Sequence, residues 1–313
     1  MNEANVVAVI VPNPFFEGAS VAYLIQSEPL TLIDTGLATD RAFDALTTGL
    51  AAEGVAIGDI KQIVLTHKHI DHIGNAWRIQ QQTGASILIH EQDIRAISDA
   101  DVDGKRFNQL ALRRLKDWHI PAKVEETLSE WPMMPKWKIQ TADATPLRDG
   151  QRIVLADGEL EVLHTPGHTM GSICLKYGRY LFSGDHILPD VSPNIGGGDM
   201  GKPRLLGHFF DSIERVRQLA DQQLTVLPGH GDPFTNLAQR CDELRSHHQE
   251  RLEKITSVLT VQESKSAYEV AQQLFGDLKD FHVVLGCAEA GSHLEYLQAE
   301  GLVTCHNGRY RLA

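Results

Sequence analysis

The sequence has few cysteines and no dense cluster of basic residues. Its four cysteines lie far apart and form no CxxC pair: Cys174, Cys241, Cys287 and Cys305. We therefore expect reduced, buried thiols of a cytosolic protein rather than a disulfide framework. The formal net charge is −12, and no block of lysines or arginines offsets it. Because an acidic surface repels phosphate backbones, this composition disfavours nucleic acid as a partner.

Long hydrophobic runs are missing as well. No apolar stretch is long enough to span a bilayer, and the N-terminus lacks the basic segment and long apolar core of a signal peptide. These absences predict a cytoplasmic protein without a membrane partner. The length of 313 residues allows a large core, either as one big domain or as a core with an appendage.

Short β-prone runs alternate with amphipathic helical patterns along most of the chain. The predicted strands cover residues 6–11, 22–25, 30–33, 63–65, 86–89, 152–155, 160–164, 173–177, 180–183 and 224–227. The predicted helices among them cover residues 40–53, 75–83, 91–97 and 209–219. Strands followed by helices, twice over, predict an α/β protein with two stacked sheets and helices outside.

The region of about 101–145 interrupts this alternation. A helical pattern over 106–118 is followed by a passage with four large side chains: Trp131, Met133, Met134 and Trp137. One interpretation is a surface excursion held down by its aromatic residues. The other is a lid or a substrate-binding wall, since loops on rigid scaffolds commonly determine specificity.

The tail has a different character. Helices are predicted over 237–259, 266–275 and 281–300, and the second begins with a capping box, Ser266 and Glu269. A hairpin over Asn307-Gly308 follows. This is the outline of a small winged-helix domain, so we divide the chain into residues 1–240 and 241–313.

The third tail helix would be the recognition helix of a nucleic-acid-binding winged helix. It carries three glutamates and neither arginine nor lysine: Glu289, Glu295 and Glu300. That charge would repel phosphates, so we favour a structural cap beside the main domain or a surface for homodimer formation.

The most informative residues are seven histidines and aspartates that come after β-prone runs. Four of them form one dense run, and the other three each directly follow a glycine. They are His67, His69, Asp71, His72, His168, Asp185 and His230. Zinc and related divalent ions favour imidazole nitrogen and carboxylate oxygen. Scattered core histidines and loop aspartates are the alternative, but the ordered set favours a metal site.

The spacing divides these residues between two ions. His67 and His69 lie two apart on an extended segment and can converge on one ion, which His168 can complete. Asp71 and His72 are adjacent and must point elsewhere, toward a second ion.

His230 can complete the second site, and Asp185 has two carboxylate oxygens with which to bridge the pair. Two ions this close would share and acidify one water, creating a bridging hydroxide near neutral pH. The sequence therefore predicts a dinuclear metal-dependent hydrolase that needs no serine or cysteine nucleophile. Zinc is the first expectation, and manganese or iron suit the same ligands.

The HxHxDH run, the later histidine, the aspartate and the last histidine, in this order, resemble the metallo-β-lactamase superfamily over essentially the whole chain. The resemblance implies a four-layered αβ/βα sandwich with the site at one edge of the sheets. It also implies that Asp34, in Leu32-Ile-Asp-Thr-Gly36, orients a metal-bound histidine. The winged-helix tail and the Asn13-Pro-Phe start look most like bacterial hydrolases related to the lactamase-β-like endoribonucleases.

Departures from family patterns narrow the activity. True di-zinc β-lactamases are exported and lack a bridging aspartate at the position of Asp185, which argues against antibiotic hydrolysis. The ligand set looks instead like that of glyoxalase II, lactonases and RNA-processing members. Glyoxalase II has a helical, glutathione-binding C-terminal region, but its basic residues do not align onto this tail, which argues against glutathione thioesters.

We predict hydrolysis of a small-molecule thioester or ester with a small or medium acyl group. The hydroxide would attack the carbonyl, and Asp71 or a metal-bound water would protonate the leaving group. The alternatives are phosphodiester cleavage by the same centre, as in an endoribonuclease, and a nucleic-acid-binding regulator that works through the winged helix.

Other histidines receive weaker assignments. His186, beside the bridging aspartate, is predicted to be structural or to support its neighbour rather than to carry protons. His247 and His248 are expected to be solvated on a charged helix, and His164 to be a core residue.

Overall fold

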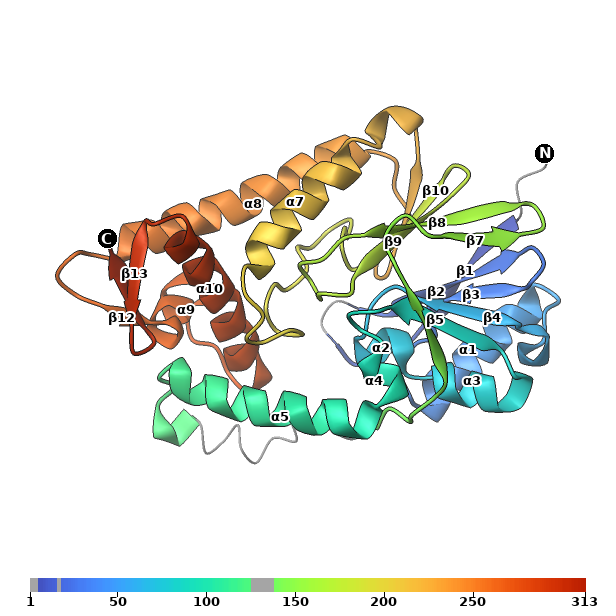
Figure 1. Cartoon of the computed structure of the whole chain (residues 1–313), viewed down its shortest axis with the longest axis horizontal. Helices are drawn as coiled ribbons and strands as arrows, with labels where there is room; N and C mark the ends of the chain where they lie inside the picture. Colours follow the sequence, from blue (N-terminus) through green and yellow to red (C-terminus); the bar gives the residue numbers. More distant parts are fainter. Residues whose placement is uncertain (1–4, 16–17, 125–137) are drawn as a thin grey trace.

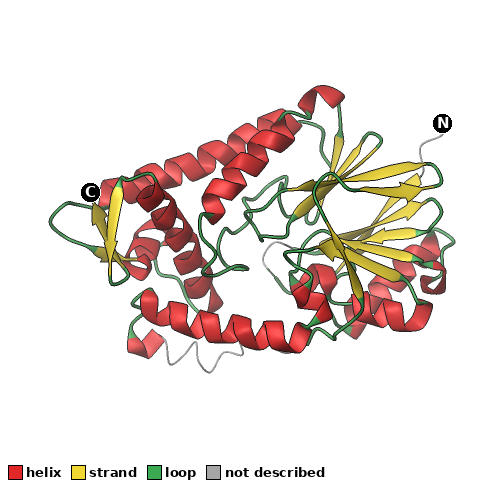
Figure 2. Cartoon of the chain, in the orientation of Figure 1, coloured by secondary structure: helices red, strands yellow, loops and turns green. Residues whose placement is uncertain are grey.

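Two β-sheets pack face to face, and helices cover their outer faces (Figures 1 and 2). The computed structural model describes residues 5–15, 18–124 and 138–313. The first sheet has the order β1 (Asn5–Val11), β2 (Ser20–Gln26), β3 (Thr31–Ile33), β4 (Gln62–Leu65), β5 (Ser86–His90) and β6 (Ala144–Leu147). The second has the order β11 (Thr225–Pro228), β10 (Tyr180–Gly184), β9 (Ile173–Tyr177), β8 (Gly158–His164) and β7 (Arg152–Leu155).

Parallel pairing brings several strand ends to one edge of the sandwich. In the first sheet, β3, β4, β5 and β6 are parallel neighbours. In the second sheet, β10 and β11 are parallel, whereas β7 to β10 are antiparallel neighbours. The loops that leave the carboxyl ends of parallel strands therefore lie close together, which is where α/β proteins commonly place their sites.

The layers are defined by where the apolar side chains are buried. Residues of both sheets, among them Ile33, Val64 and Phe182, form one core between the sheets. A second core lies between the first sheet and the helices α1 (Asp40–Ala52) and α3 (Ala76–Thr83). A third lies between the second sheet and α7 (Leu205–Arg217), α8 (Leu237–Val258) and α10 (Phe281–Ala299). This is the predicted four-layered αβ/βα sandwich.

Local sequence signals set several element boundaries. The Thr39 side chain accepts a hydrogen bond from the Ala42 amide and begins α1. Ser266 and Glu269 form the predicted capping box at the start of α9 (Ala267–Phe275). Asn307 and Gly308 both have positive φ, 50° and 73°, and join β13 (Val303–His306) to β14 (Arg309–Leu312).

Three predicted helices differ from those observed, and the one expected over 209–219 begins earlier, as α7. The helix expected over 106–118 begins earlier, as α5 (Ala100–Asp117), which runs from the first sheet toward the tail (Figure 1). The helix expected over 91–97 is reduced to the single turn α4 (Arg95–Ser98), because residues 91–94 form a turn. The large side chains singled out in this region, Trp131, Met133, Met134 and Trp137, lie outside the described residues.

The tail consists of α8, α9, α10 and a small sheet in which β14 lies between β12 (Lys265–Ser266) and β13. The three helices and the hairpin of β13 and β14 are those expected from the sequence, β12 was not expected, and the assignment to a separate winged-helix domain stays a prediction. The proposed boundary after residue 240 falls within α8. Buried residues of α10 such as Leu294 belong to the same core as Phe209 of α7 and Leu181 of β10. The tail therefore has a core in common with the second sheet.

Helix α2 (Ile70–Ile73) and two short 3₁₀ turns, η1 (Ile57–Asp59) and η2 (Ala220–Gln222), complete the elements named here. None of the helices in the described ranges has the length and apolar character needed to cross a membrane.

Leu294→Ala tests whether the tail and the second sheet unfold together. The side chain is fully buried, so we expect a loss of about 2–5 kcal/mol in the free energy of unfolding. Because the core is shared, thermal unfolding followed by calorimetry should remain a single transition at a lower temperature. A separate early transition of the tail would contradict the shared core.

Candidate metal centre

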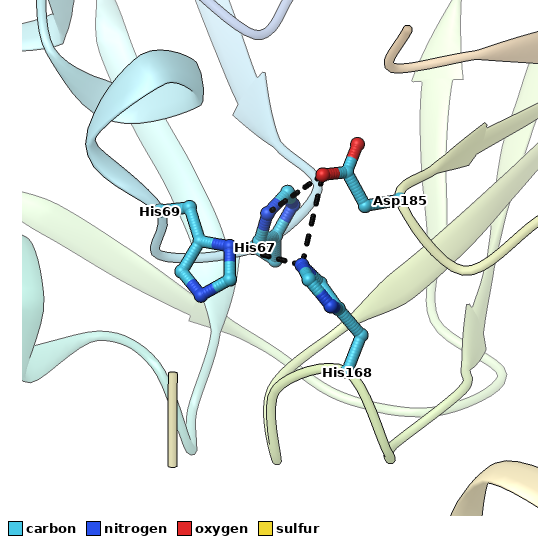
Figure 3. A group of neighbouring side chains, drawn as sticks. All are labelled: His67, His69, His168 and Asp185. Carbon is cyan, nitrogen blue, oxygen red and sulfur yellow. Dashed lines mark hydrogen bonds and ion pairs between the residues drawn. The ribbon is translucent and has the colours of Figure 1, made fainter. Parts of the chain in front are cut away.

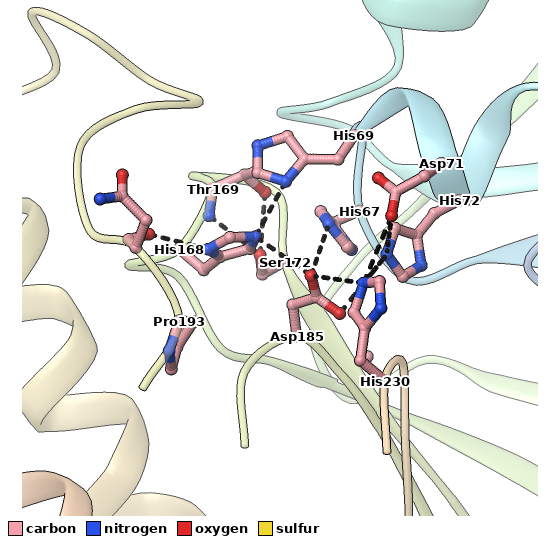
Figure 4. Close-up of polar contacts among 12 residues, drawn as sticks. His67, His69, Asp71, His72, His168, Thr169, Ser172, Asp185, Pro193 and His230 are labelled. Atoms are coloured by element: carbon pink, nitrogen blue, oxygen red, sulfur yellow. Dashed lines mark hydrogen bonds and ion pairs between the residues drawn. The ribbon is translucent and has the colours of Figure 1, made fainter. Parts of the chain in front are cut away.

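All seven predicted site residues lie together at one edge of the sandwich, in loops and in the short helix α2 (Figure 4). The loop after β4 carries His67 and His69, and the short helix α2 that follows it carries Asp71 and His72. The loops after β8, β10 and β11 carry one residue each. The four segments supply, in chain order, His67, His69, Asp71, His72, His168, Asp185 and His230.

The first group of side chains is His67, His69, His168 and Asp185, whose donor atoms all lie within 4.8 Å of one another (Figure 3). His168 Nε2 lies 2.9 Å from His69 Nδ1 and 3.6 Å from Asp185 Oδ2. His67 Nε2 lies 3.8 Å from the same carboxylate oxygen. Three imidazoles from two loops thus face one carboxylate.

The second group is Asp71, His72 and His230. The two Nε2 atoms of its histidines are 3.3 Å apart, and His230 Nε2 is also 3.3 Å from Asp71 Oδ2. Asp185 reaches this group as well, because its Oδ1 is 3.4 Å from His72 Nε2 and its Oδ2 is 3.5 Å from His230 Nε2. Asp185 is therefore common to both groups, as expected of a bridging residue.

Hydrogen bonds on the far side of three rings determine which nitrogen faces the centre. The Nδ1 atoms of His72, His168 and His230 lie 2.9, 2.9 and 3.1 Å from Asp34 Oδ2, the Asn194 carbonyl and the Ala19 carbonyl, respectively. These oxygens can only accept, so each Nδ1 donates. In the neutral form of each ring, Nε2 then carries the lone pair and faces the other ligand atoms, which is the arrangement typical of metal-ligating histidines.

Asp34 orients two histidines at once. It directly follows β3, where its φ of 59° turns the chain. Its carboxylate accepts from the Thr66 amide at 2.8 Å and from the Thr66 hydroxyl at 2.7 Å, as well as from His72. Because the Thr66 hydroxyl donates to Asp34, it accepts from His67 Nδ1, 3.1 Å away. Asp34 thus contacts His72, as the family resemblance implied, and acts on His67 through Thr66.

The first group is electrostatically neutral apart from its carboxylate. Burial lowers the pKa of His67 and of His69 well below the usual value, and it also lowers the pKa of His168. Desolvation disfavours the charged imidazolium, so these rings stay neutral near pH 7 and keep their lone pairs available.

The second group carries more negative charge. Burial alone would lower the pKa of His72 and His230, but Asp185 and Asp71 outweigh it. The pKa of His72 is raised well above its usual value, and that of His230 to about 10. Burial would likewise raise the pKa of Asp71, yet His72 and His230 lower it to about 2. This carboxylate field favours a cation, whether protons or a metal ion.

The donor set fits divalent ions. Among the described residues, His67 Nε2 and Asp185 Oδ1 are buried without a hydrogen-bond partner, and buried polar atoms rarely stay unpaired. Ligands at tetrahedral positions around zinc lie about 3.4 Å apart, given bond lengths of about 2.0–2.2 Å. The separations above scatter around that value, so both groups could hold a metal ion.

Asp93 is a supporting residue that the sequence analysis did not identify. It is buried in the turn after β5 and accepts from the Lys68 amide at 3.0 Å and the Thr169 hydroxyl at 2.6 Å. It also accepts from the Gly171 amide at 3.1 Å. Asp93 therefore joins the loop of His67 and His69 to the loop of His168, and its only sequence signal is that it follows a β-prone run.

Two other supporting residues hold Asp71. The Ser20 hydroxyl donates to Asp71 Oδ2 at 2.9 Å, and Asn13 Nδ2 donates to the same oxygen at 3.3 Å. Both donors come from the first two strands and the turn between them, far from Asp71 in sequence. The family resemblance draws attention to the Asn13-Pro-Phe segment but does not predict this contact.

Two assignments made from the sequence are wrong, those of His248 and His164. His248 is completely buried on α8, whereas its neighbour His247 is exposed as expected. Helix α10 packs on that face of α8, where His248 Nδ1 lies 3.1 Å from His293 Nε2. His164 is half-buried rather than in the core, with Nε2 bonded to the Met170 carbonyl. His186 is buried against Phe209, and burial lowers its pKa to about 3, which agrees with a structural role.

Comparisons with known proteins agree with this geometry. The family model of the Metallo-beta-lactamase superfamily matches residues 16–230. The probable metallo-hydrolase YqjP of Bacillus subtilis (strain 168) is 31% identical over 98% of this chain and 96% of its own length. Human acyl-coenzyme A thioesterase MBLAC2 is 30% identical over 75% of this chain and 81% of its own length.

Among solved structures, the metallo-beta-lactamase family protein TTHA1429 from Thermus thermophilus is similar along nearly the full length. It is 30% identical, covers 98% of both chains and superposes with a TM-score of 0.83. The family match, the near full-length relatives and the two groups of histidine and aspartate donors lead to one conclusion: the chain belongs to the metallo-beta-lactamase superfamily and is a metallo-hydrolase.

Proposed function

We propose that the protein is a dinuclear metal-dependent hydrolase of thioesters, with acyl-coenzyme A thioesters as its main substrate class. The observation that carries this proposal is the pair of adjacent donor groups with Asp185 in common. The similarity to a relative named as an acyl-coenzyme A thioesterase supports the thioester class.

In this proposal, each donor group holds one divalent ion. His67, His69 and His168 would hold the first ion, Asp71, His72 and His230 would hold the second, and Asp185 could serve both. Such ions, when bound, supply an activated water and a positive charge that polarises the substrate carbonyl. The metal-ligating atoms are oriented beforehand by the chain, so little reorganisation is needed during the reaction.

Asp71 is the proposed catalytic residue. It is ionised in the resting protein, since its pKa is lowered to about 2, and Ser20 and Asn13 hold one of its oxygens. It can therefore accept a proton from the attacking water and then donate that proton to the leaving group. A thiolate needs less protonation than an alkoxide, because thiols are far more acidic than alcohols, with a pKa of about 8.5 for cysteine. Thioester hydrolysis therefore depends less than ester hydrolysis on protonation of the leaving group by Asp71.

A substrate panel tests the activity. We expect kcat/KM for acyl-coenzyme A thioesters to exceed that for matched oxygen esters, for glutathione thioesters and for bis(p-nitrophenyl) phosphate by about 100-fold or more, equivalent to about 3 kcal/mol in transition-state free energy. Protein stripped of metal by a chelator is the control for background hydrolysis. Faster cleavage of the phosphodiester would overturn the proposal in favour of a nuclease-like activity.

Asp71→Asn tests whether oxygen and sulfur leaving groups differ in their dependence on proton transfer by Asp71. Asparagine cannot carry the proton, so we expect kcat for an oxygen ester to fall about 10²–10⁴-fold, the usual contribution of an acid–base residue, and kcat for the thioester to fall less. Metal content is measured alongside by elemental analysis. Equal losses for both substrates with full metal content would contradict proton transfer by Asp71.

Asp34→Asn tests the orientation of His72. The asparagine amide would oppose the donors of Thr66 and His72, so we expect metal affinity to fall about 10–100-fold, as is typical when such partners are lost. Asp40→Asn is the matched control, because Asp40 is 88% exposed and pairs only with Arg78 among the described residues. Calorimetric titration of the metal-free proteins measures both; unchanged affinity in Asp34→Asn would refute this role.

The raised pKa values of the second group predict a pH dependence of metal binding. His72 and His230 are protonated near pH 7 in the metal-free protein, and a metal ion must displace those protons. Affinity at this group should therefore rise with pH up to about 10, the pKa of His230, by as much as about tenfold per pH unit for each displaced proton. The first group, already neutral, should bind with little pH dependence. Titrations between pH 6 and 8 check this; identical pH profiles for both binding steps would contradict it.

A further inference from the structure

A loop formed by residues 192–200 connects the candidate metal centre to the tail. We call it the bridging loop. Pro193 of this loop lies beside His168 (Figure 4). The next residue, Asn194, accepts from His168 Nδ1 through its main-chain carbonyl at 2.9 Å. Further along, Asp199 accepts from Lys68 Nζ at 2.6 Å and from the Met170 amide at 2.5 Å. The loop thus contacts both segments that carry the histidines of the first group.

Three consecutive glycines let the bridging loop pass between His69 and α10. A Cβ atom on Gly198 would lie 2.2 Å from His69 Nε2, so the backbone itself packs against that ring. On the other side, a Cβ atom on Gly196 would lie 2.7 Å from the Ala288 carbonyl, and Gly196 has a φ of +117°. Nothing larger than glycine fits at these contacts, so α10 and His69 lie on opposite faces of the same short segment.

Glu289 of α10 holds the bridging loop from the tail side. Its side chain is buried, and Oε2 accepts from the Ile195 amide at 2.7 Å and from Asn194 Nδ2 at 3.1 Å. The other oxygen, Oε1, pairs with Arg251 of α8. Ser292, one turn further along α10, donates to the Ile195 carbonyl at 2.9 Å. A buried carboxylate is costly unless it is fully paired, and here each oxygen has a donor.

The neighbouring histidines do not make this cluster a further metal site. His248, Glu289 and His293 have donor atoms within 4.8 Å of one another. However, His293 Nδ1 donates to the Glu289 carbonyl at 2.7 Å, and His293 Nε2 lies 3.1 Å from His248 Nδ1. His248 Nε2 lies 3.0 Å from the Ser192 hydroxyl. Every ring nitrogen has a partner and the Arg251 cation already neutralises the carboxylate, so the cluster is a hydrogen-bonded chain.

We propose that Glu289 is a positioning residue of the metal centre: it fixes the main chain at Asn194 and Ile195, so that the Asn194 carbonyl holds the His168 ring. His168 Nε2 then stays directed at the first group, and the bridging loop keeps His69 in place. The inference rests on the proposed function in that it assumes a metal ion at the first group.

The effect should be confined to one of the two groups. His72 and His230 are oriented by Asp34 and the Ala19 carbonyl, which belong to segments of the first sheet. Asp71 is held by Ser20 and Asn13. None of these contacts within the described residues involves the bridging loop or α10. Loss of the Glu289 contacts should therefore weaken the binding of a metal ion at the first group and leave binding at the second group unchanged.

The test compares Glu289→Gln and Asn194→Ala with Glu295→Gln. Glu289→Gln keeps the shape of the side chain but removes the negative charge that pairs with Arg251. Asn194→Ala removes the side-chain amide that bonds to Glu289, while the main-chain carbonyl that accepts from His168 is still present. Glu295 lies on the same helix, is 29% exposed and pairs with Arg114 of α5, so its variant is the matched control. The metal-free proteins are titrated with Zn²⁺ by calorimetry, and their thermal unfolding is recorded in parallel.

We expect one of the two Zn²⁺ binding steps to weaken about 10–100-fold in both variants and in the double variant alike, because the residues act as one unit. The other step and the control should stay within about threefold of the parent protein, below the range of such losses. ¹⁵N NMR of the metal-free protein gives a readout without metal: the His168 ring should lose its fixed Nδ1–H form.

Several outcomes would overturn the inference. Equal weakening of both steps together with a lower unfolding temperature would show general destabilisation instead. Unchanged binding and an unchanged His168 ring would show that Glu289 does not position it. A further Zn²⁺ step in the parent protein that Glu289→Gln abolishes would show a metal site at His248, Glu289 and His293. If the parent protein bound two ions but cleaved no thioester, the proposed function would fail while the positioning test remained valid.

Discussion

The candidate metal centre depends on the hydrogen bonds that buried imidazoles donate from the ring nitrogen that faces away from the centre. A neutral histidine offers its lone pair in a fixed direction when its other nitrogen donates to a fixed acceptor, and four of the five histidines of the centre have one. Here the acceptors are the Asp34 carboxylate, the Thr66 hydroxyl, and the main-chain carbonyls of Ala19 and Asn194. The sheets, their strand ends and the loops around them place these acceptors. The fold therefore contributes ring orientation, beyond bringing residues together.

Whether the sequence predicts a part of the centre depends on whether that part is a side chain or a main-chain atom that accepts a hydrogen bond. The seven donors follow strands in a recognisable order, and Asp34 lies in a motif of its own. Both were available from the sequence, as were the two sheets and the layers. The carbonyls of Ala19 and Asn194 act through backbone position, which leaves no residue type to recognise. Asp93 is similar, since a single aspartate in a turn has many ordinary explanations.

The error at His248 has a related physical cause. Helix α8 is rich in charged residues, and a charged helix predicts a solvated surface when it is considered alone. Its buried face is decided by what packs on it, and here that is α10 and the bridging loop. Helix α10 is a second case: its glutamates indicate only a charge that repels phosphates, yet Glu289 is buried in a paired network. Tertiary packing overrode the local pattern in both cases.

The two donor groups depend on different parts of the chain. Segments of the first sheet hold Asp71, His72 and His230, whereas the bridging loop, itself packed on the tail, holds His168 and contacts His69. Asp185 is common to both groups, but the contacts that orient their other members are separate. The tail has a core in common with the second sheet, and a change there reaches the centre through a few residues of loop. Sequence variation in the tail can thus tune one half of the centre while the other half keeps its geometry.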